Sequence, residues 1–211
     1  MSMKQGDRLF DNVDVLKIPE REYRVLNALD VCIHRCLYKY ELIFQIIDKN
    51  KTELDSTLVL ITWELIDWLD RTRKILGYGA GLNKKDPDFI LTYQQLDKAE
   101  DFRHILQHFD GFINKTNGNS YAPLGAVTAI NWLGDKGQGN EFKILTFTVG
   151  NVRGVGVDLG SVEMPEIIKE KVDYVTLQFE DEKLNISEIA YKLLPFYESL
   201  RETIEIKYPK T

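Results

Sequence analysis

The sequence predicts an α+β fold: mainly a helical bundle of four long helices, with a small antiparallel β-sheet inserted between the third and the last helix. Two observations lead to this prediction. Apolar residues recur at helical spacing through the first half of the chain and again near its end. Between them, short segments rich in β-branched and aromatic residues alternate with glycine-containing turns, a pattern typical of antiparallel strands.

The same patterns predict how the domain is organised. We expect an N-terminal tail over residues 1–18, which show little periodicity, and a single domain over residues 19–211. Within that domain, residues 19–116 and 185–207 are expected to form the helical bundle and residues 121–180 the β insert.

The first two helices differ in how their apolar residues are distributed. The first should begin at Pro19 and Glu20 and run to Asp48 with one apolar stripe. The second should be capped by Asp55 or Ser56 and run to about Leu76, with Gly77 ending it in a left-handed conformation. Its core, LVLITWELIDWL, is apolar nearly all round, which places this helix in the middle of the bundle. One polar stripe remains on it, formed by Glu64, Asp67, Arg71 and Lys74.

The third helix is expected from about Asp88 to Lys115, either as one helix or broken near Thr92. Spacings of three and four predict its buried stripe, which consists of Ala99, Phe102, Leu106, Phe109 and Ile113.

Four strands and a final helix complete the predicted fold. The strands are expected at residues 126–133, 141–149, 154–159 and 172–179. The last helix should begin at a capping box formed by Asn185 and Glu188 and extend to about Glu205. Pro195 should kink this helix or mark a break in it.

Composition restricts the partners and the location. The net charge of −6 argues against a broad nucleic-acid surface, although a local basic site remains compatible with it. Two cysteines in 211 residues are typical of a reducing compartment, so we expect a cytoplasmic protein. No segment reaches the roughly 18 to 20 apolar residues that span a bilayer, and we expect no membrane partner. GYGAG at 77–81 lacks the Gly-Lys-Ser/Thr of a phosphate loop, and we expect no cofactor.

The segment AEDFRHILQHFD, residues 99–110, carries the main candidate site. His104 and His108 are four residues apart and share one helix face, and Arg103 precedes His108 by five residues. The spacing resembles the R-x(4 to 6)-H motif of the HEPN superfamily, in which Asn, Asp or His commonly follows the arginine. Here His104 occupies that position.

The resemblance implies a helical, commonly dimeric protein with metal-independent ribonuclease activity. Arg103 and His108 would then be the catalytic pair, His104 an accessory polar residue, and the partners a second copy of the chain and RNA at a local site. Histidine can act as a base or an acid near neutral pH, and an arginine fork can hold a phosphate. Carboxylates that could orient either group are Glu64, Asp67, Glu100 and Asp101. The β insert departs from a plain HEPN bundle.

Three other interpretations of these residues remain open. Arg103 and His108 could simply flank an amphipathic helix, paired with nearby acids. Cys32 and Cys36, also four residues apart, could join His104 and His108 in a zinc site, although both cysteines also fall in an apolar stripe. Finally, the chain could be a non-catalytic binding or regulatory module that docks through its sheet insert.

Overall fold

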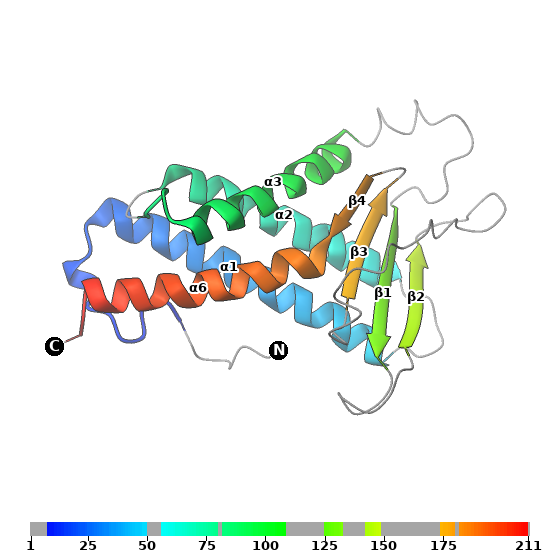
Figure 1. Cartoon of the computed structure of the whole chain (residues 1–211), viewed down its shortest axis with the longest axis horizontal. Helices are drawn as coiled ribbons and strands as arrows, with labels where there is room; N and C mark the ends of the chain where they lie inside the picture. Colours follow the sequence, from blue (N-terminus) through cyan, green and yellow to red (C-terminus); the bar gives the residue numbers. More distant parts are fainter. Residues whose placement is uncertain are drawn as a thin grey trace.

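The computed structural model describes residues 8–49, 56–79, 82–108, 125–132, 142–148, 174–179 and 182–210. In these residues, four long helices form a bundle and a four-stranded antiparallel sheet lies at one end of it (Figure 1). This arrangement confirms the predicted α+β fold, with the sheet between the third and the last long helix.

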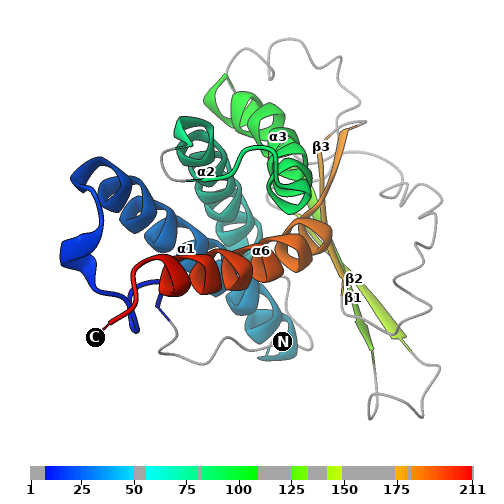
Figure 2. The ribbon, with the colours of Figure 1, turned by 60° about the vertical axis from the view of Figure 1, so that its left-hand side comes forward.

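Helix α2 (Ser56–Tyr78) is the central element, as its apolar circumference predicted. It packs against α1 (Glu20–Lys49) on one side and α3 (Pro87–Gln107) on the other, and it also contacts the sheet (Figure 2). Leu58, Leu65 and Ile66 are almost completely buried. Burial on several sides explains why this helix can be apolar nearly all round.

The end of α2 differs from the prediction by two residues. Gly77 is still helical, and Gly79 adopts the left-handed conformation, with φ of 60°. The Lys84 ammonium donates a hydrogen bond to the Gly77 carbonyl at 2.8 Å, so the following turn closes over the helix end. A glycine is needed at position 79 because L-residues with a side chain rarely adopt a positive φ.

Helix α3 is continuous through Thr92, but it ends earlier than predicted. Asp86 caps its start by accepting a hydrogen bond from the Asp88 amide at 2.8 Å. The helix ends at Gln107 rather than near Lys115. Ala99 and Phe102 are buried as predicted.

The rest of the predicted α3 stripe needs a correction. Leu106, which was predicted to be buried, is 36% exposed, and Ile105, which was not in the predicted stripe, is buried. Each helical residue turns about 100°, so successive steps of three from Ala99 to Phe102 and Ile105 move the buried face round the helix by about 60° each, and this drift leaves Leu106 outside the buried face in the last turn. Phe109 and Ile113 lie outside the described residues.

The sheet has the strand order β2-β1-β3-β4, and every neighbouring pair is antiparallel. Its strands are β1 (Ala126–Trp132), β2 (Phe142–Thr148), β3 (Tyr174–Phe179) and β4 (Glu182–Asn185). The predicted strand at 154–159 lies outside the described residues, and β4 was not predicted. Strand β4 is a short, charged edge strand, a composition that gives little alternating signal.

Helix α6 (Ile186–Lys207) follows β4 without a loop. Asn185 forms its N-cap, and the Asn185 side-chain oxygen accepts a hydrogen bond from the Glu188 amide at 2.9 Å. The cap confirms the start predicted from the N-x-x-E spacing. Pro195 lies inside the helix without breaking it.

Residues 8–18 were expected to belong to a tail, but they pack against the bundle. Leu9 is fully buried, and Val13 forms an isolated antiparallel bridge with Pro209. The Asp14 amide donates to the Tyr208 carbonyl at 2.9 Å, which also ties this segment to the chain beyond α6. We call the paired segments 8–18 and 205–210 the terminal clasp. Apart from the three-residue 3-10 helix Val15–Lys17, this segment is irregular, so it has no period for a pattern analysis to detect.

Candidate functional site at the end of helix α3

The two histidines of the motif lie together at the C-terminal end of α3. His108 is the C-cap residue, and its backbone N–H donates to the His104 carbonyl at 3.0 Å. This hydrogen bond preserves the helical i, i+4 alignment up to the last residue. The two imidazole rings stack with centroids 6.1 Å apart and planes inclined by 26°, and both residues are exposed.

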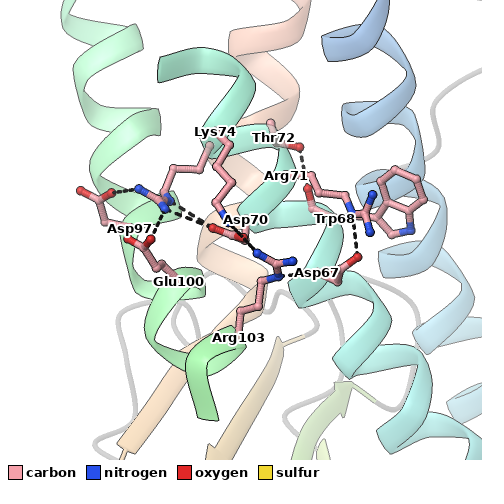
Figure 3. A network of polar contacts seen from close by, with 10 residues as sticks. Asp67, Trp68, Asp70, Arg71, Thr72, Lys74, Asp97, Glu100 and Arg103 are labelled. Atoms are coloured by element: carbon pink, nitrogen blue, oxygen red, sulfur yellow. Dashed lines mark hydrogen bonds and ion pairs between the residues drawn. The ribbon is translucent and has the colours of Figure 1, made fainter. Parts of the chain in front are cut away.

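Arg103 faces α2 rather than either histidine. Its Nε donates to Asp67 at 3.0 Å and its Nη1 donates to Asp70 at 2.6 Å (Figure 3). The Arg103 side chain is only 20% exposed. Within the part of the chain that the structure describes, the Arg103 side chain makes no hydrogen bond or ion pair with His104 or His108, so the predicted catalytic pair does not interact directly.

Asp70 is the centre of a charge network that joins α2 to α3. Its carboxylate is fully buried and also interacts with Lys74 at 2.8 Å and Arg73 at 3.2 Å. Arg73 in turn pairs with Asp97 and Glu100 of α3. Burial alone would raise the pKa of Asp70, but hydrogen bonds from Lys74 and Arg73 outweigh burial and lower it. Asp70 is therefore held as a carboxylate.

Of the carboxylates that the sequence analysis named as possible partners of Arg103 or His108, one lies in this α2–α3 charge network in direct contact with Arg103. Asp67 does contact Arg103, whereas Glu64 pairs with Lys39 and Glu100 with Arg73. Asp70 was not predicted, because the sequence places it next to the apolar core of α2 without showing which neighbouring helix supplies its cations.

The two cysteines are core residues of α1. Cys32 and Cys36 are buried, and burial raises the pKa of both thiols. The Cys36 sulfur lies 3.6 Å from the Thr72 hydroxyl. Among the described residues, which include both cysteines and all three histidines of the chain, no three metal-binding side chains lie close enough to hold an ion. The structure therefore gives no support to the Cys–His zinc site.

A second polar cluster, which the sequence analysis did not predict, surrounds Asp30. The Tyr197 hydroxyl donates to the Asp30 carboxylate, and His34 Nε2 lies 2.9 Å from the same hydroxyl. Arg8 Nη1 and the Leu9 amide also donate to Asp30, at 3.1 and 3.2 Å. Burial would raise the pKa of Asp30, but the hydrogen bonds from His34, Tyr197 and Leu9 outweigh it and lower the pKa to about 2.

One signal in the sequence could have revealed this cluster. Asp30 lies between Leu29 and Ile33 of the apolar stripe of α1, and a carboxylate there must be buried with hydrogen-bond donors around it. The pattern shows that donors are needed, but not that α6 and residues 8–9 provide them.

Comparisons with known proteins add no further identification. Neither protein-family models, curated proteins nor solved structures give a match to this chain. Among the described residues, no helix is both long and apolar enough to cross a membrane. The likeness to the HEPN superfamily therefore stays a prediction from the motif.

Proposed function

We propose that this protein is a metal-independent, HEPN-like ribonuclease that cleaves single-stranded RNA, with its site at the end of α3. The observation that supports the proposal is the exposed pair of imidazoles, His104 and His108, with ring centroids 6.1 Å apart. Arg103, adjacent to His104 in the chain, adds a guanidinium held by two carboxylates. The proposal includes a cytoplasmic homodimer, in which the second copy supplies an equivalent set of residues.

Two imidazoles are sufficient for the proton transfers of RNA cleavage. In the proposed reaction, His108 takes the proton from a ribose 2′-hydroxyl, whose oxygen attacks the adjacent phosphorus. His104 donates a proton to the 5′-oxygen as the bond from phosphorus to that oxygen breaks. The products are a 2′,3′-cyclic phosphate and a free 5′-hydroxyl, and no metal takes part.

In the proposed reaction Arg103 binds a phosphate oxygen of the RNA, and its contacts with two carboxylates of α2 hold the guanidinium in place. The contacts of Arg103 use Nε and Nη1, which leaves Nη2 as the donor that we assign to a phosphate oxygen. The α2–α3 charge network contains four acidic and four basic side chains, so its charges balance. They are Asp67, Asp70, Asp97 and Glu100, and Arg71, Arg73, Lys74 and Arg103. Such a site does not attract RNA broadly, in line with the net charge of −6.

The test is cleavage of a single-stranded RNA oligonucleotide by untagged protein, with and without EDTA. We expect wild type to cleave in both conditions and His108→Ala to lose at least about 100-fold in rate, the usual contribution of a general base or acid. Arg103→Lys keeps a cation beside Asp70 but removes the Nη2 donor, so it should also lose cleavage while staying folded.

Two comparisons make this test specific. His34→Gln changes the one other histidine of the chain, which contacts Tyr197 in the Asp30 cluster, and should cleave like wild type. Unfolding by urea, measured on every variant, separates lost activity from lost structure. Wild-type protein that leaves RNA intact, or whose activity disappears with EDTA, would contradict the proposal.

One observation favours a second candidate, a non-catalytic protein-binding or regulatory module. Both charged contacts of Arg103 point to α2, and such contacts suffice to explain the arginine as a structural residue that joins two helices. In that case wild-type protein cleaves no RNA, and Arg103→Ala lowers the free energy of unfolding by roughly 3 kcal/mol because it leaves a buried carboxylate with fewer partners.

A further inference from the structure

We propose that His104 and His108 form a two-histidine chelating site for a divalent transition-metal ion such as Ni²⁺, Zn²⁺ or Cu²⁺. Imidazole nitrogen is a preferred ligand of these ions, and histidines four residues apart on a helix present their rings on the same face. The i, i+4 hydrogen bond from the His108 amide to the His104 carbonyl keeps this alignment although His108 is the cap residue.

The geometry of the two rings suits chelation. The ring centroids lie 6.1 Å apart and the planes are inclined by only 26°. Both side chains are on the surface, where rotation about their side-chain bonds meets little packing. A modest rotation can direct one nitrogen of each ring at a shared ion, about 2.0 to 2.1 Å from each nitrogen.

The surroundings leave both rings available. In the described part of the chain, the ring nitrogens of His104 and His108 have no hydrogen-bond or ion-pair partner. By contrast, His34 Nε2 is held 2.9 Å from the Tyr197 hydroxyl. The rings also lie at the C-terminal end of α3, where the helix dipole gives a partial negative charge that favours a cation.

The ligand number predicts an exchangeable ion rather than a structural one. No third histidine, cysteine or carboxylate gathers with this pair among the described residues, so we assign the remaining coordination positions to water. Structural zinc sites use four protein ligands, whereas sites with open positions hold their ion less tightly and exchange it. The proposed site therefore differs from the Cys–His zinc site in both composition and strength.

A bound ion would also regulate the proposed reaction. It takes the nitrogen lone pairs that the two imidazoles need for proton transfer, so it should inhibit RNA cleavage. This consequence depends on the proposed ribonuclease function, but ion binding itself does not.

The binding test is isothermal titration of NiCl₂ into the full, untagged chain. We expect wild type to bind one ion per chain, and His104→Ala and His108→Ala each to bind at least about tenfold more weakly. Once one imidazole has bound the ion, the second imidazole binds it at a high effective concentration because both are on the same chain. Either alanine substitution leaves one imidazole and removes this gain in affinity. His34→Gln is the matched control and should bind like wild type. Both alanine substitutions are on the surface, and circular dichroism will verify that the variants stay folded.

The outcomes for the two proposals can be told apart. Wild type that binds no Ni²⁺, or a His104→Ala variant that binds as tightly as wild type, overturns the chelating site whatever the RNA assay gives. Ni²⁺ binding in a protein that never cleaves RNA supports the site and removes the ribonuclease. Cleavage that continues at saturating Ni²⁺ overturns the inhibitory role.

Discussion

Asp30 connects three parts of the chain through a single buried carboxylate. It accepts hydrogen bonds from Arg8 and Leu9 near the N-terminus and from Tyr197 of α6, while lying on α1. A buried charge with this many donors stabilises a fold only while it stays ionised. The cluster therefore makes stability depend on acid pH.

Asp30→Asn tests that dependence. The pKa of about 2 in the folded protein lies below the ordinary 3.8 expected in the unfolded chain. The carboxylate thus stabilises the fold above pH 4, and this contribution is lost as the pH falls from about 4 to about 2. At pH 7 we expect Asp30→Asn to lower the free energy of unfolding by about 2 kcal/mol.

Urea unfolding at pH 7 and at pH 2.5 measures the effect. The difference between wild type and Asp30→Asn should shrink at the lower pH, because the Asp30 carboxyl of the unfolded chain is then mostly protonated and ionising it in the folded protein contributes less stability. Glu198→Gln, an exposed carboxylate on α6, is the control and should change stability by less than about 0.5 kcal/mol. An equal deficit at both pH values would show that charge is not what Asp30 contributes.

At the residue scale, the sequence predicted shared helix faces better than contact partners. The spacing of four placed His104 and His108 together, and the structure shows their rings stacked. The partner of Arg103 could not be chosen in the same way. Asp67 and Asp70 are both carboxylates on α2, and only the packing of α3 on α2 determines that Arg103 contacts the two together.

Pro195 is the clearest departure from local preference at the element scale. A proline inside a helix cannot donate to the carbonyl four residues earlier and costs roughly 3 kcal/mol relative to alanine. Helix α6 nevertheless continues through it, because buried residues on both sides, Leu194 and Phe196 among them, hold the helix on the bundle. Of the kink or break predicted at Pro195, the break is thus overridden by tertiary packing.

Pro195→Ala should therefore stabilise the protein. Pro195 is exposed, so the substitution removes no core contact, and alanine restores a helical hydrogen bond. Part of the gain is offset because proline also restricts the unfolded chain. We expect an increase of about 2 kcal/mol in the free energy of unfolding, measured with urea. Lys192→Ala changes another exposed residue of α6 and should have little effect. If Pro195→Ala is no more stable than wild type, the backbone of α6 has already adapted to the proline.

The elements that were predicted well are those with a long, regular apolar period. The starts of α1, α2 and α6 and the antiparallel strands β1, β2 and β3 follow directly from spacing and caps. Strand β4 and the end of α3 were missed for different reasons. The pairing with β3 creates β4, and the helical period of α3 continues in the sequence beyond Gln107, where the helix ends.

At the scale of the whole molecule, the terminal clasp joins residues near both ends of the chain (Figure 1). Two leucines of its first segment provide a matched test. Leu9 is fully buried and Leu16 is 93% exposed. Leu9→Ala should lower the free energy of unfolding by about 3 kcal/mol, as cavities in a core do. Leu16→Ala should change it by less than about 0.5 kcal/mol. Equal, small effects in urea unfolding would mean that residues 8–18 do not contribute to the core.

The clasp also imposes an order on events during synthesis. Val13 and Asp30 leave the ribosome well before Pro209 and Tyr197, which pair with Val13 and Asp30 respectively. Until then the Val13 backbone and the Asp30 carboxylate lack part of their native environment, however well α1 and α2 have formed. Contacts this distant along the chain form slowly, because loop closure must be accomplished first. Residues 8–18 of the growing chain therefore lack their partners until residues 197–210 have been made, and a chaperone that acts on this chain should bind most to residues 8–18 during that interval.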